Sequence, residues 1–300
     1  MSEPTVAYVV VAYRSAGDLP ACLDSISADR PHGSRIIVVD NASPDDSALV
    51  AERHPSRPEI LRNAENIGFG RACNQAIGQS GADLVFLVNP DARLRPDATR
   101  LLIAAAAMDV GAVGPRIVDP AGQWSAAAAG FEPSMRSALG HFLLLARVPW
   151  IGRLFPPFQL SGRSHAQSVD WVGGAAMLVR AEPFRDVGGF DPAIFLYGED
   201  IDLCRRLRVG GFSVLYEPQA VVDHDLGGSQ GLEQSSRWYV ALHAYVARQR
   251  GSRYARTFSG LAAIGLAIRA IAFAVPRPAQ ARRMTIAART AAHCALGGHG

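Results

Sequence analysis

The chain has 300 residues, enough for one large domain or a domain with an appendage, and 49% of them are hydrophobic, so a sizeable core can form. Its 30 basic residues are all Arg, and this absence of Lys excludes Walker-A nucleotide triphosphatases as well as Schiff-base and pyridoxal enzymes. The formal charge of +3 is uneven: residues 233–300 hold ten Arg and one Glu, whereas residues 1–232 hold twenty Arg and twenty-six acids. We therefore expect an acidic body followed by a basic extension that seeks a surface.

The four Cys residues are far apart and form no CxxC pair. This spacing predicts a reducing compartment, without disulfides or structural zinc. No charged segment followed by an apolar one precedes the first strand pattern, so we expect no secretory signal.

The first hundred residues alternate between strand and helix patterns. Continuous apolar runs predict strands buried on both faces. The expected strands are 6–11, 35–39, 60–61 and 84–88, and the expected helices are 19–26, one beginning near 43–46, 69–78 and 97–108. This alternation indicates a mainly parallel sheet with right-handed crossovers, in which ligands bind beyond the carboxyl ends of the strands.

The rest of the chain is less regular at first and then helical. We expect short strands at 112–118, 213–216 and 220–223, helices at 134–147 and 199–209, and a loop rich in Pro, Gly, Ser and Arg at 149–168. From residue 234 onward the pattern is helical. The predicted domains are a catalytic domain of residues 1–232, with halves of about 1–110 and 111–232, and a helical extension of residues 233–300.

Two acidic clusters lie about a hundred residues apart. Asn89-Pro90-Asp91 follows the fourth strand, where carboxylates suit a divalent cation that stays open to substrate oxygens. Glu199 and Asp200 open a helix, whose N-terminal dipole keeps a carboxylate ionised and suits it to act as a general base. For Asp202 we expect an ion pair with Arg206, one turn along the helix. A metal and a base together can move a group off a diphosphate.

Other polar positions have weaker signals. Asp40 ends the second strand, where it could accept from a pyrimidine or a ribose hydroxyl, or cap a turn. The segment Asn66–Arg71 contains Gly68 and Gly70 but not the third glycine of a dinucleotide fingerprint. His224 follows a strand, and its imidazole could be a metal ligand or structural.

One motif favours another enzyme class. Residues 227–231 match the G-x-S-x-G elbow of hydrolases. That fold needs a later acid and then a His, and only Glu233 follows as an acid. We therefore discount the hydrolase.

In this order, seven short strings resemble family 2 glycosyltransferases of the GT-A fold over about residues 5–230. The strings are 9–14, 39–43, 66–69, 87–91, 171–174, 188–191 and 199–206. The Asn-Pro-Asp form and the sequence 197–203 are most similar to the rhamnosyltransferase branch, in which Asn89 replaces the first Asp of the family's DxD motif. The resemblance implies an α/β fold with a mixed, mainly parallel sheet flanked by helices, and a C-terminal helical extension.

The resemblance also implies roles for individual residues. The nucleotide sugar would be lined by Ala12, Tyr13, Arg14, Asp40, Asn66, Gly68, Arg71, Asn89 and Asp91. The metal, Mg²⁺ or Mn²⁺, would be held on the diphosphate by Asp91 and His224. The sugar and acceptor pocket would be shaped by Trp171, Gly173 and Gly174. Asp200 would be the base, with Glu199 as the alternative, and direct displacement would invert the anomeric centre.

The resemblance further implies a donor such as dTDP-rhamnose and an acceptor saccharide linked to polyprenyl diphosphate. The alternatives are another sugar nucleotide, or an inactive module that binds sugar nucleotides.

Residues 258–275 are mostly small and apolar but include Arg269, so an interfacial helix fits better than a membrane span or an ordinary packed helix. We expect peripheral binding to an anionic membrane surface at the cytoplasmic face of the plasma membrane, without nucleic acid binding. The sequence leaves the oligomeric state open.

Overall fold

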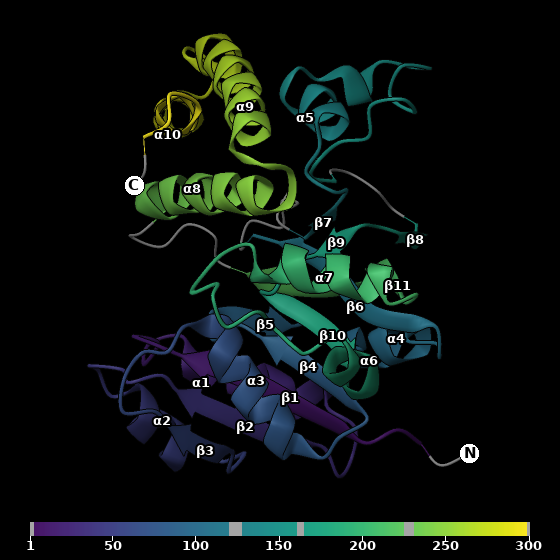
Figure 1. Ribbon diagram of the computed structural model, residues 1–300. Coiled ribbons are helices and arrows are strands. Elements are labelled where there is room, and N and C mark those ends of the chain that lie inside the picture. Colours follow the sequence, from purple (N-terminus) through teal and green to yellow (C-terminus); the bar gives the residue numbers. More distant parts are fainter. Residues whose placement is uncertain (1–2, 120–127, 161–164, 225–230, 299–300) are drawn as a thin grey trace. The chain divides into compact units, whose positions relative to one another are not determined.

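A computed structural model describes residues 3–119, 128–160, 165–224 and 231–298 of the protein (Figure 1). Contacts divide the chain into two compact units. The α/β unit contains residues 1–130 and 160–226, and the helical unit contains residues 131–159 and 227–300. Residues 131–159, which the sequence analysis assigned to the acceptor half of the catalytic domain, thus group with the C-terminal helices.

One half of the main sheet in the α/β unit is parallel. Its strands are β1 (Val6–Ala12), β2 (Arg35–Asp40), β3 (Glu59–Arg62) and β4 (Leu84–Val88), and the helices between them are α1 (Leu19–Asp29), α2 (Ser47–Arg53) and α3 (Phe69–Ser80). These strands pair in the order β3-β2-β1-β4, all in parallel. Every residue of β4 is buried, as its unbroken apolar run predicts.

The other half of the sheet is mixed. Its elements are β5 (Ala92–Leu94), α4 (Ala98–Ala105), β6 (Val110–Val118), β8 (Gln167–Ser168), β10 (Ala176–Arg180), α6 (Ala181–Asp186), α7 (Glu199–Val209) and β11 (Ser213–His224). The full order is β3-β2-β1-β4-β10-β6-β11-β5, with β8 on β11, while β7 (Ala129–Gly130) and β9 (Trp171–Val172) form a separate pair. The mixed, mainly parallel sheet flanked by helices is therefore confirmed.

Three local predictions differ from the structure. The two short strands expected at 213–216 and 220–223 are one strand, β11, whose pairing with β6 shifts between Glu217 and Val221 and so accommodates Pro218. Strand β5 was not predicted, because three residues carry too little periodicity. The helix expected at 134–147 ends early, because Leu144 has a φ of +61° that an α-helix does not tolerate.

Two helices bring their N-terminal ends together in the α/β unit. Helix α3 packs on β1, β2 and β4, and α7 packs on β6, β9 and β11. The backbone N–H of Phe69 in α3 donates to the carbonyl of Phe195, four residues before α7 (3.1 Å). A Cβ added at Gly70 would lie 3.9 Å from the Cβ of Glu199. This meeting point adjoins the carboxyl ends of the parallel strands.

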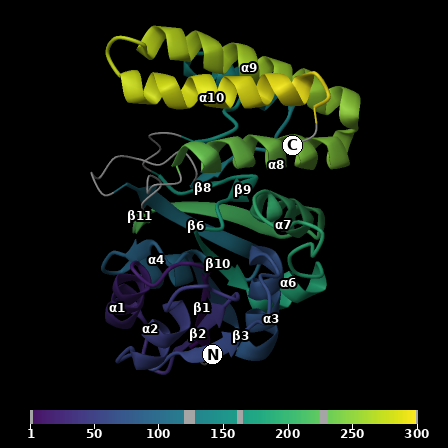
Figure 2. The ribbon, with the colours of Figure 1, turned by 90° about the vertical axis from the view of Figure 1, so that its left-hand side faces the viewer.

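The helical unit contains the expected C-terminal helices and one earlier helix. Its elements are α5 (Met135–Phe142), the 3₁₀ turn η1 (Leu145–Arg147), α8 (Gly231–Arg250), α9 (Ser252–Phe273) and α10 (Pro278–Ala295). Helices α9 and α10 run antiparallel side by side (Figure 2), and Arg256 Nε donates to the Ala295 carbonyl (2.9 Å). The rings of Phe142 in α5 and Phe258 in α9 pack edge to face, 6.1 Å apart.

Candidate active site

An imidazole and a carboxylate meet where β4 ends. Strand β11 pairs with β5 so that His224 lies opposite Ala92, the residue after Asp91. His224 Nε2 is 3.0 Å from Asp91 Oδ1, and Asn89 Nδ2 is 3.5 Å from the same nitrogen. Strand pairing thus brings together two predicted metal ligands that are 133 positions apart in the chain.

These two side chains fit a divalent cation that shares its ligands with a substrate. Within the described ranges, no group of three or more His, Cys, Asp or Glu could hold a metal ion. Mg²⁺ is commonly held by one or two carboxylates together with substrate phosphate oxygens and water, and a neutral imidazole is a common metal ligand. Asp91 is partly exposed, so it can reach such a substrate. The pair therefore suits a metal that is completed by a diphosphate.

Asp200 lies in a polar setting at the start of α7. Its Oδ2 accepts from the backbone N–H of Gly174 (3.0 Å), and its Oδ1 accepts from the backbone N–H of Ile201 (2.8 Å). Burial raises the pKa of Asp200, while these N–H groups oppose the rise. Because Asp200 is partly exposed and its charge is stabilised by these donors, it is the carboxylate that can meet a substrate.

Glu199 has a different environment. It is 5% exposed, and its Oε2 has no hydrogen-bond partner among the described residues. Burial, and then the negative charge of Asp200, raise the pKa of Glu199 to about 8. At neutral pH Glu199 is therefore the protonated member of the pair. Of the two candidate bases, the geometry favours Asp200.

Two consecutive residues connect the acid pair to the metal-ligand pair. Gly174 donates its N–H to Asp200, and the carbonyl of Ala175 accepts from the N–H of Asn89 (2.9 Å). The base candidate and the Asn89–Asp91 turn are thus held to neighbouring peptide units of one segment. A substrate bound beyond the carboxyl end of β4 can contact both Asp200 and Asp91.

The ends of β1 and β2 form the predicted nucleotide side. Asp40 is buried, and its Oδ1 has no hydrogen-bond partner within the described part of the chain. A buried carboxylate oxygen without a partner is costly unless a ligand supplies a donor. Beside it, Tyr13 is 42% exposed, and the Arg14 guanidinium lies over its ring, 5.5 Å from the centroid. The carbonyl of Ala12 accepts from the N–H of Asn41 (2.9 Å).

Asn41 fixes the loop that leads into α3, a role that the sequence analysis did not assign. Its Nδ2 donates to Asn66 Oδ1 (2.9 Å), and its Oδ1 accepts from Asn63 Nδ2 (3.1 Å) and from the N–H of Ile67 (3.2 Å). The signal was present, because Asn41 directly follows Asp40 at a strand end. Asn66 Oδ1 also accepts from the N–H of Gly68 (3.0 Å), so this predicted residue is held by the loop.

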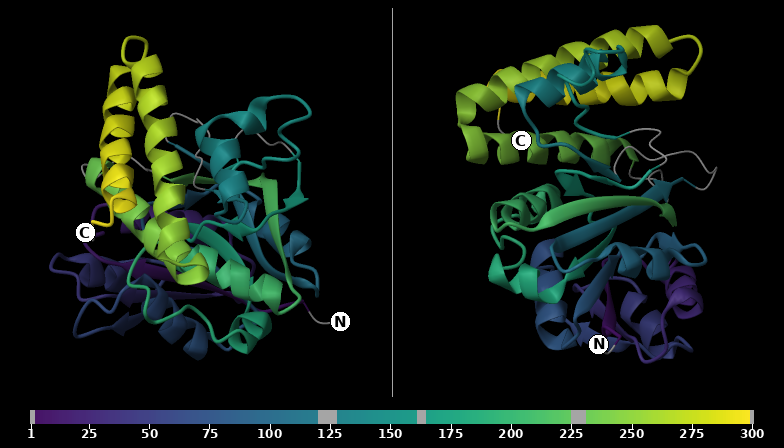
Figure 3. Two further views of the ribbon diagram at one scale, coloured as in Figure 1. Left: turned by 45° about the horizontal axis from the view of Figure 1, so that its top comes forward. Right: turned by 90° about the vertical axis from the view of Figure 1, so that its right-hand side faces the viewer.

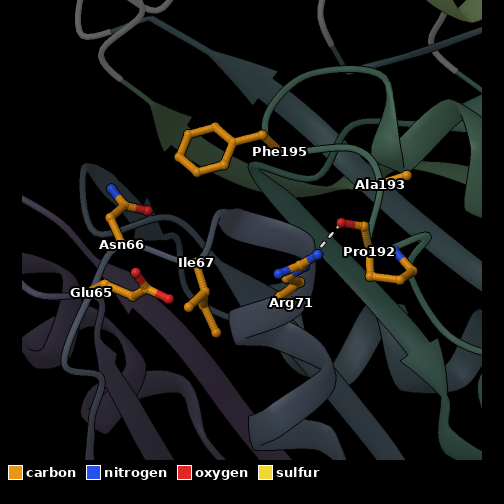
Figure 4. A pocket seen from close by; sticks show the side chains of 7 residues that line it. All are labelled: Glu65, Asn66, Ile67, Arg71, Pro192, Ala193 and Phe195. Carbon is orange, nitrogen blue, oxygen red and sulfur yellow. Dashed lines mark hydrogen bonds between the residues drawn. The ribbon is translucent and has the colours of Figure 1, made fainter.

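A pocket of about 330 Å³ lies beside this loop (Figure 4). It is lined by Glu65, Asn66, Ile67, Arg71, Pro192, Ala193 and Phe195. Arg71 Nε donates to the Pro192 carbonyl (2.9 Å), which joins the first turn of α3 to the loop before α7. Phe195 is 58% exposed, and no periodicity or motif had indicated it.

The remaining predictions concern the segment before β10 and the helix α7. Trp171 is 3% exposed, so its indole has almost no surface with which to contact a sugar, and the N–H of Gly173 donates to the Ala128 carbonyl (2.9 Å). The expected pair of Asp202 and Arg206 is confirmed, at 2.8 Å. Residues 225–230, which hold most of the G-x-S-x-G string, lie outside the described residues.

Comparison with known families gives matches over most of the chain. The family model described as "Glycosyl transferase family group 2" matches residues 84–294, and "Glycosyl transferase family 2" matches residues 8–155. The chain belongs to glycosyltransferase family 2. This family 2 enzyme is 32% identical to the N-acetylglucosaminyl-diphospho-decaprenol L-rhamnosyltransferase of Mycobacterium tuberculosis over 257 residues, which cover 78% of this chain and 80% of the relative.

Further similarities concern part of the chain or the fold. Rhamnosyltransferase WbbL of Escherichia coli is 40% identical over 87 residues, 27% of this family 2 enzyme and 32% of the relative. The structure of mannosyltransferase PcManGT from Pyrobaculum calidifontis, in complex with GDP-Man and Mn²⁺, superposes with a TM-score of 0.66 at 18% identity, covering 98% of this chain and 87% of that one. S. aureus TarS gives a TM-score of 0.52 at 12% identity, covering 98% and 92%. These likenesses confirm the GT-A fold.

Proposed function

We propose that this family 2 enzyme transfers L-rhamnose from dTDP-rhamnose to a saccharide linked to polyprenyl diphosphate. The observation that carries the proposal is the 32% identity to the mycobacterial rhamnosyltransferase over four-fifths of that relative. An acceptor with a lipid tail agrees with an enzyme that binds peripherally at the cytoplasmic face of a membrane. The basic, apolar C-terminal helices support such a location.

The proposed chemistry is a direct displacement with inversion. The acceptor oxygen forms a bond to the anomeric carbon of the donor, and the bond from that carbon to the diphosphate oxygen breaks. Asp200 takes the proton of the acceptor hydroxyl, because it is the partly exposed member of the acid pair and two backbone N–H groups stabilise its charge. Glu199 is buried and protonated at neutral pH, so it carries no negative charge with which to accept that proton.

Asp91 and His224 would hold Mg²⁺ or Mn²⁺ against the diphosphate. A bound metal would supply positive charge that neutralises the leaving diphosphate. The structure of PcManGT, which shares the fold, is a complex with GDP-Man and Mn²⁺. Asp40, with its open carboxylate oxygen, would accept from the nucleoside, and Tyr13 and Arg14 would flank it.

A donor screen tests the proposal. The purified enzyme is offered dTDP-rhamnose, dTDP-glucose, UDP-GlcNAc and GDP-mannose, each with a polyprenyl-diphosphate-GlcNAc analogue, with and without Mg²⁺. We expect product from dTDP-rhamnose, with an anomeric configuration opposite to that of the donor. Product from a different nucleotide sugar alone would reject the rhamnosyl assignment, and retained configuration would reject the single-displacement mechanism. Donor binding without transfer or hydrolysis would favour an inactive sugar-nucleotide module.

A further inference from the structure

A short turn in the helical unit exposes an unusual density of apolar side chains. We call residues 144–154, which follow α5, the Trp150 turn. Trp150 is 86% exposed and Leu154 is 60% exposed, and Leu144, Val148 and Ile151 are exposed as well. Soluble proteins seldom gather so much apolar surface in one place without a partner for it.

The Trp150 turn is folded, so this exposure does not result from a lack of local structure. The N–H of Gly152 donates to the Val148 carbonyl (2.9 Å), and the N–H of Phe155 donates to the Ile151 carbonyl (3.1 Å). Arg136 of α5 donates from Nε and Nη2 to the Leu154 carbonyl (2.9 and 2.8 Å). These bonds hold the turn in shape while its apolar side chains point outward.

The backbone at Trp150 gives a second, independent observation. Its φ is +72°, in the left-handed region that bulky side chains rarely adopt. A conformation of this kind persists only when the surrounding structure enforces it, and such positions cluster at functional sites. Here the enforced conformation displays the largest apolar side chain of the turn to solvent.

The charge of the helical unit indicates what covers this surface. The unit holds thirteen Arg and two Glu, Glu132 and Glu233, a formal charge of +11, whereas the α/β unit holds seventeen Arg and twenty-five acids, a formal charge of −8. Residues 133–169 contain no acid, and Arg147 and Arg153 of the Trp150 turn are exposed. An apolar tip among exposed Arg side chains is complementary to an anionic lipid surface.

Helix α9 offers a matching stripe in the same unit. Ile264, Ile268 and Ile271 are each more than half exposed, at spacings that place them on one helical face, and Val275, two residues beyond the end of α9, is exposed as well. Of the described helices, α9 has the length and apolar composition to cross a membrane. Its one charge within the apolar stretch, Arg269, turns inward and donates to the His141 carbonyl in the last turn of α5. The exposed stripe is therefore free of charge.

The Trp150 turn and α9 are neighbours through α5. A Cβ added at Gly265 of α9 would clash with the Phe142 carbonyl, so the two helices approach closely there (Figure 3). The turn begins two residues after Phe142. Both apolar surfaces therefore belong to one packed body.

We propose that the Trp150 turn is a membrane-docking element that inserts Trp150 and Leu154 among the lipids of an anionic bilayer, with Arg147 and Arg153 at the headgroups. Trp suits the boundary between lipid tails and headgroups, because its ring is apolar and its N–H is polar. The helical unit of a second copy is a poorer occupant, because two units of +11 repel each other. The inference does not depend on which sugar is transferred.

Vesicle sedimentation of the full-length enzyme tests the proposal, with phosphatidylcholine vesicles that contain or lack phosphatidylglycerol. We expect binding that requires phosphatidylglycerol and weakens in high salt. The double variant Trp150→Ser/Leu154→Ser should bind about tenfold more weakly or worse, since it removes two inserting side chains. The matched control is Met108→Ser/Val209→Ser, which removes two exposed apolar side chains of the α/β unit and should bind normally.

Trp150→Phe locates the element independently of binding strength. This variant should bind almost as well as the wild type but lose most of the fluorescence quenching by brominated lipid. Undiminished vesicle binding by the double Ser variant, or unchanged quenching in Trp150→Phe, overturns the proposal. A stable dimer in solution that the double Ser variant dissociates overturns it as well, because a second copy then covers the turn. A sugar-transfer assay with a water-soluble acceptor should be unaffected by these variants, which separates failure here from failure of the proposed reaction.

Discussion

Replacing Glu199 with Gln distinguishes the roles of Glu199 and Asp200, the two carboxyl groups at the start of α7. Gln has nearly the shape of a protonated Glu and cannot ionise. Because the pKa of Glu199 is about 8, its carboxyl is protonated by about ten to one at pH 7, and the substitution changes little there. We expect Glu199→Gln to keep transfer activity within a few-fold of the wild type at pH 7. Asp200→Asn should bind the donor and lose about 10²- to 10⁴-fold in turnover, the usual contribution of a general base.

The same variant has a pH-dependent effect on stability. The folded-state pKa of Glu199 lies above the unfolded value of 4.5, so the folded state binds more protons between pH 4.5 and about 8. The wild type therefore loses stability as pH rises through this window, by about 1.4 kcal/mol per unit at most. Between about pH 6 and pH 8 we expect a loss on the order of 2 kcal/mol that Glu199→Gln does not undergo.

Urea denaturation of the wild type and Glu199→Gln at pH 6 and pH 8 measures this difference. All other titrating groups are present in both proteins, so their contributions cancel. A stability difference that stays constant with pH would show that Glu199 is not protonated in the folded state. If Glu199→Gln loses turnover as fully as Asp200→Asn while remaining folded, the assignment of Asp200 as sole base is wrong.

Further expected outcomes concern the metal ligands, two glycines and Asp40. Chelation with EDTA should stop transfer, and His224→Ala should require a higher Mg²⁺ or Mn²⁺ concentration for its recovery; full rates in chelator would reject the metal. Gly68 has a φ of +87°, and an added Cβ would lie 2.6 Å from the Phe195 carbonyl oxygen, so Gly68→Ala should lower the free energy of unfolding by about 1–3 kcal/mol in thermal denaturation. The control Gly78→Ala, in open space on α3, should raise the free energy of unfolding by up to about 1 kcal/mol. Asp40→Asn should weaken dTDP binding about tenfold in calorimetry, because a carboxylate acceptor is lost; unchanged affinity would remove it from the nucleotide site.

The sequence predicts the parallel half of the sheet well, because strands buried on both faces carry an unmistakable apolar run, as β4 does. The resemblance to family 2 glycosyltransferases pairs Asp91 with His224, and the structure brings these two side chains together. The local residue pattern does not rank Glu199 against Asp200, and only the family resemblance favours Asp200, because the two are adjacent and differ in burial and in the donors they meet. That difference arises from Gly174, a residue distant in sequence.

Packing between distant segments explains the other differences. Residues 131–159 join the C-terminal helices through contacts such as that between Phe142 and Phe258, which no local pattern encodes. The segment 149–168 is rich in Pro and Gly, so the sequence predicts a loop there. Its composition does not reveal that Trp150 is held outward by backbone hydrogen bonds.

The pairing of β11 with β5 has a consequence for how the enzyme matures. Successive side chains on a strand point to opposite faces, so a slip of one residue would turn the imidazole of His224 away from Asp91. A nascent chain that does not yet extend to residue 224 can pair β1 to β4 in parallel, but it lacks the imidazole that meets Asp91. Binding of a divalent ion would therefore report the register of β11, because the site would form only when β11 has paired correctly with β5.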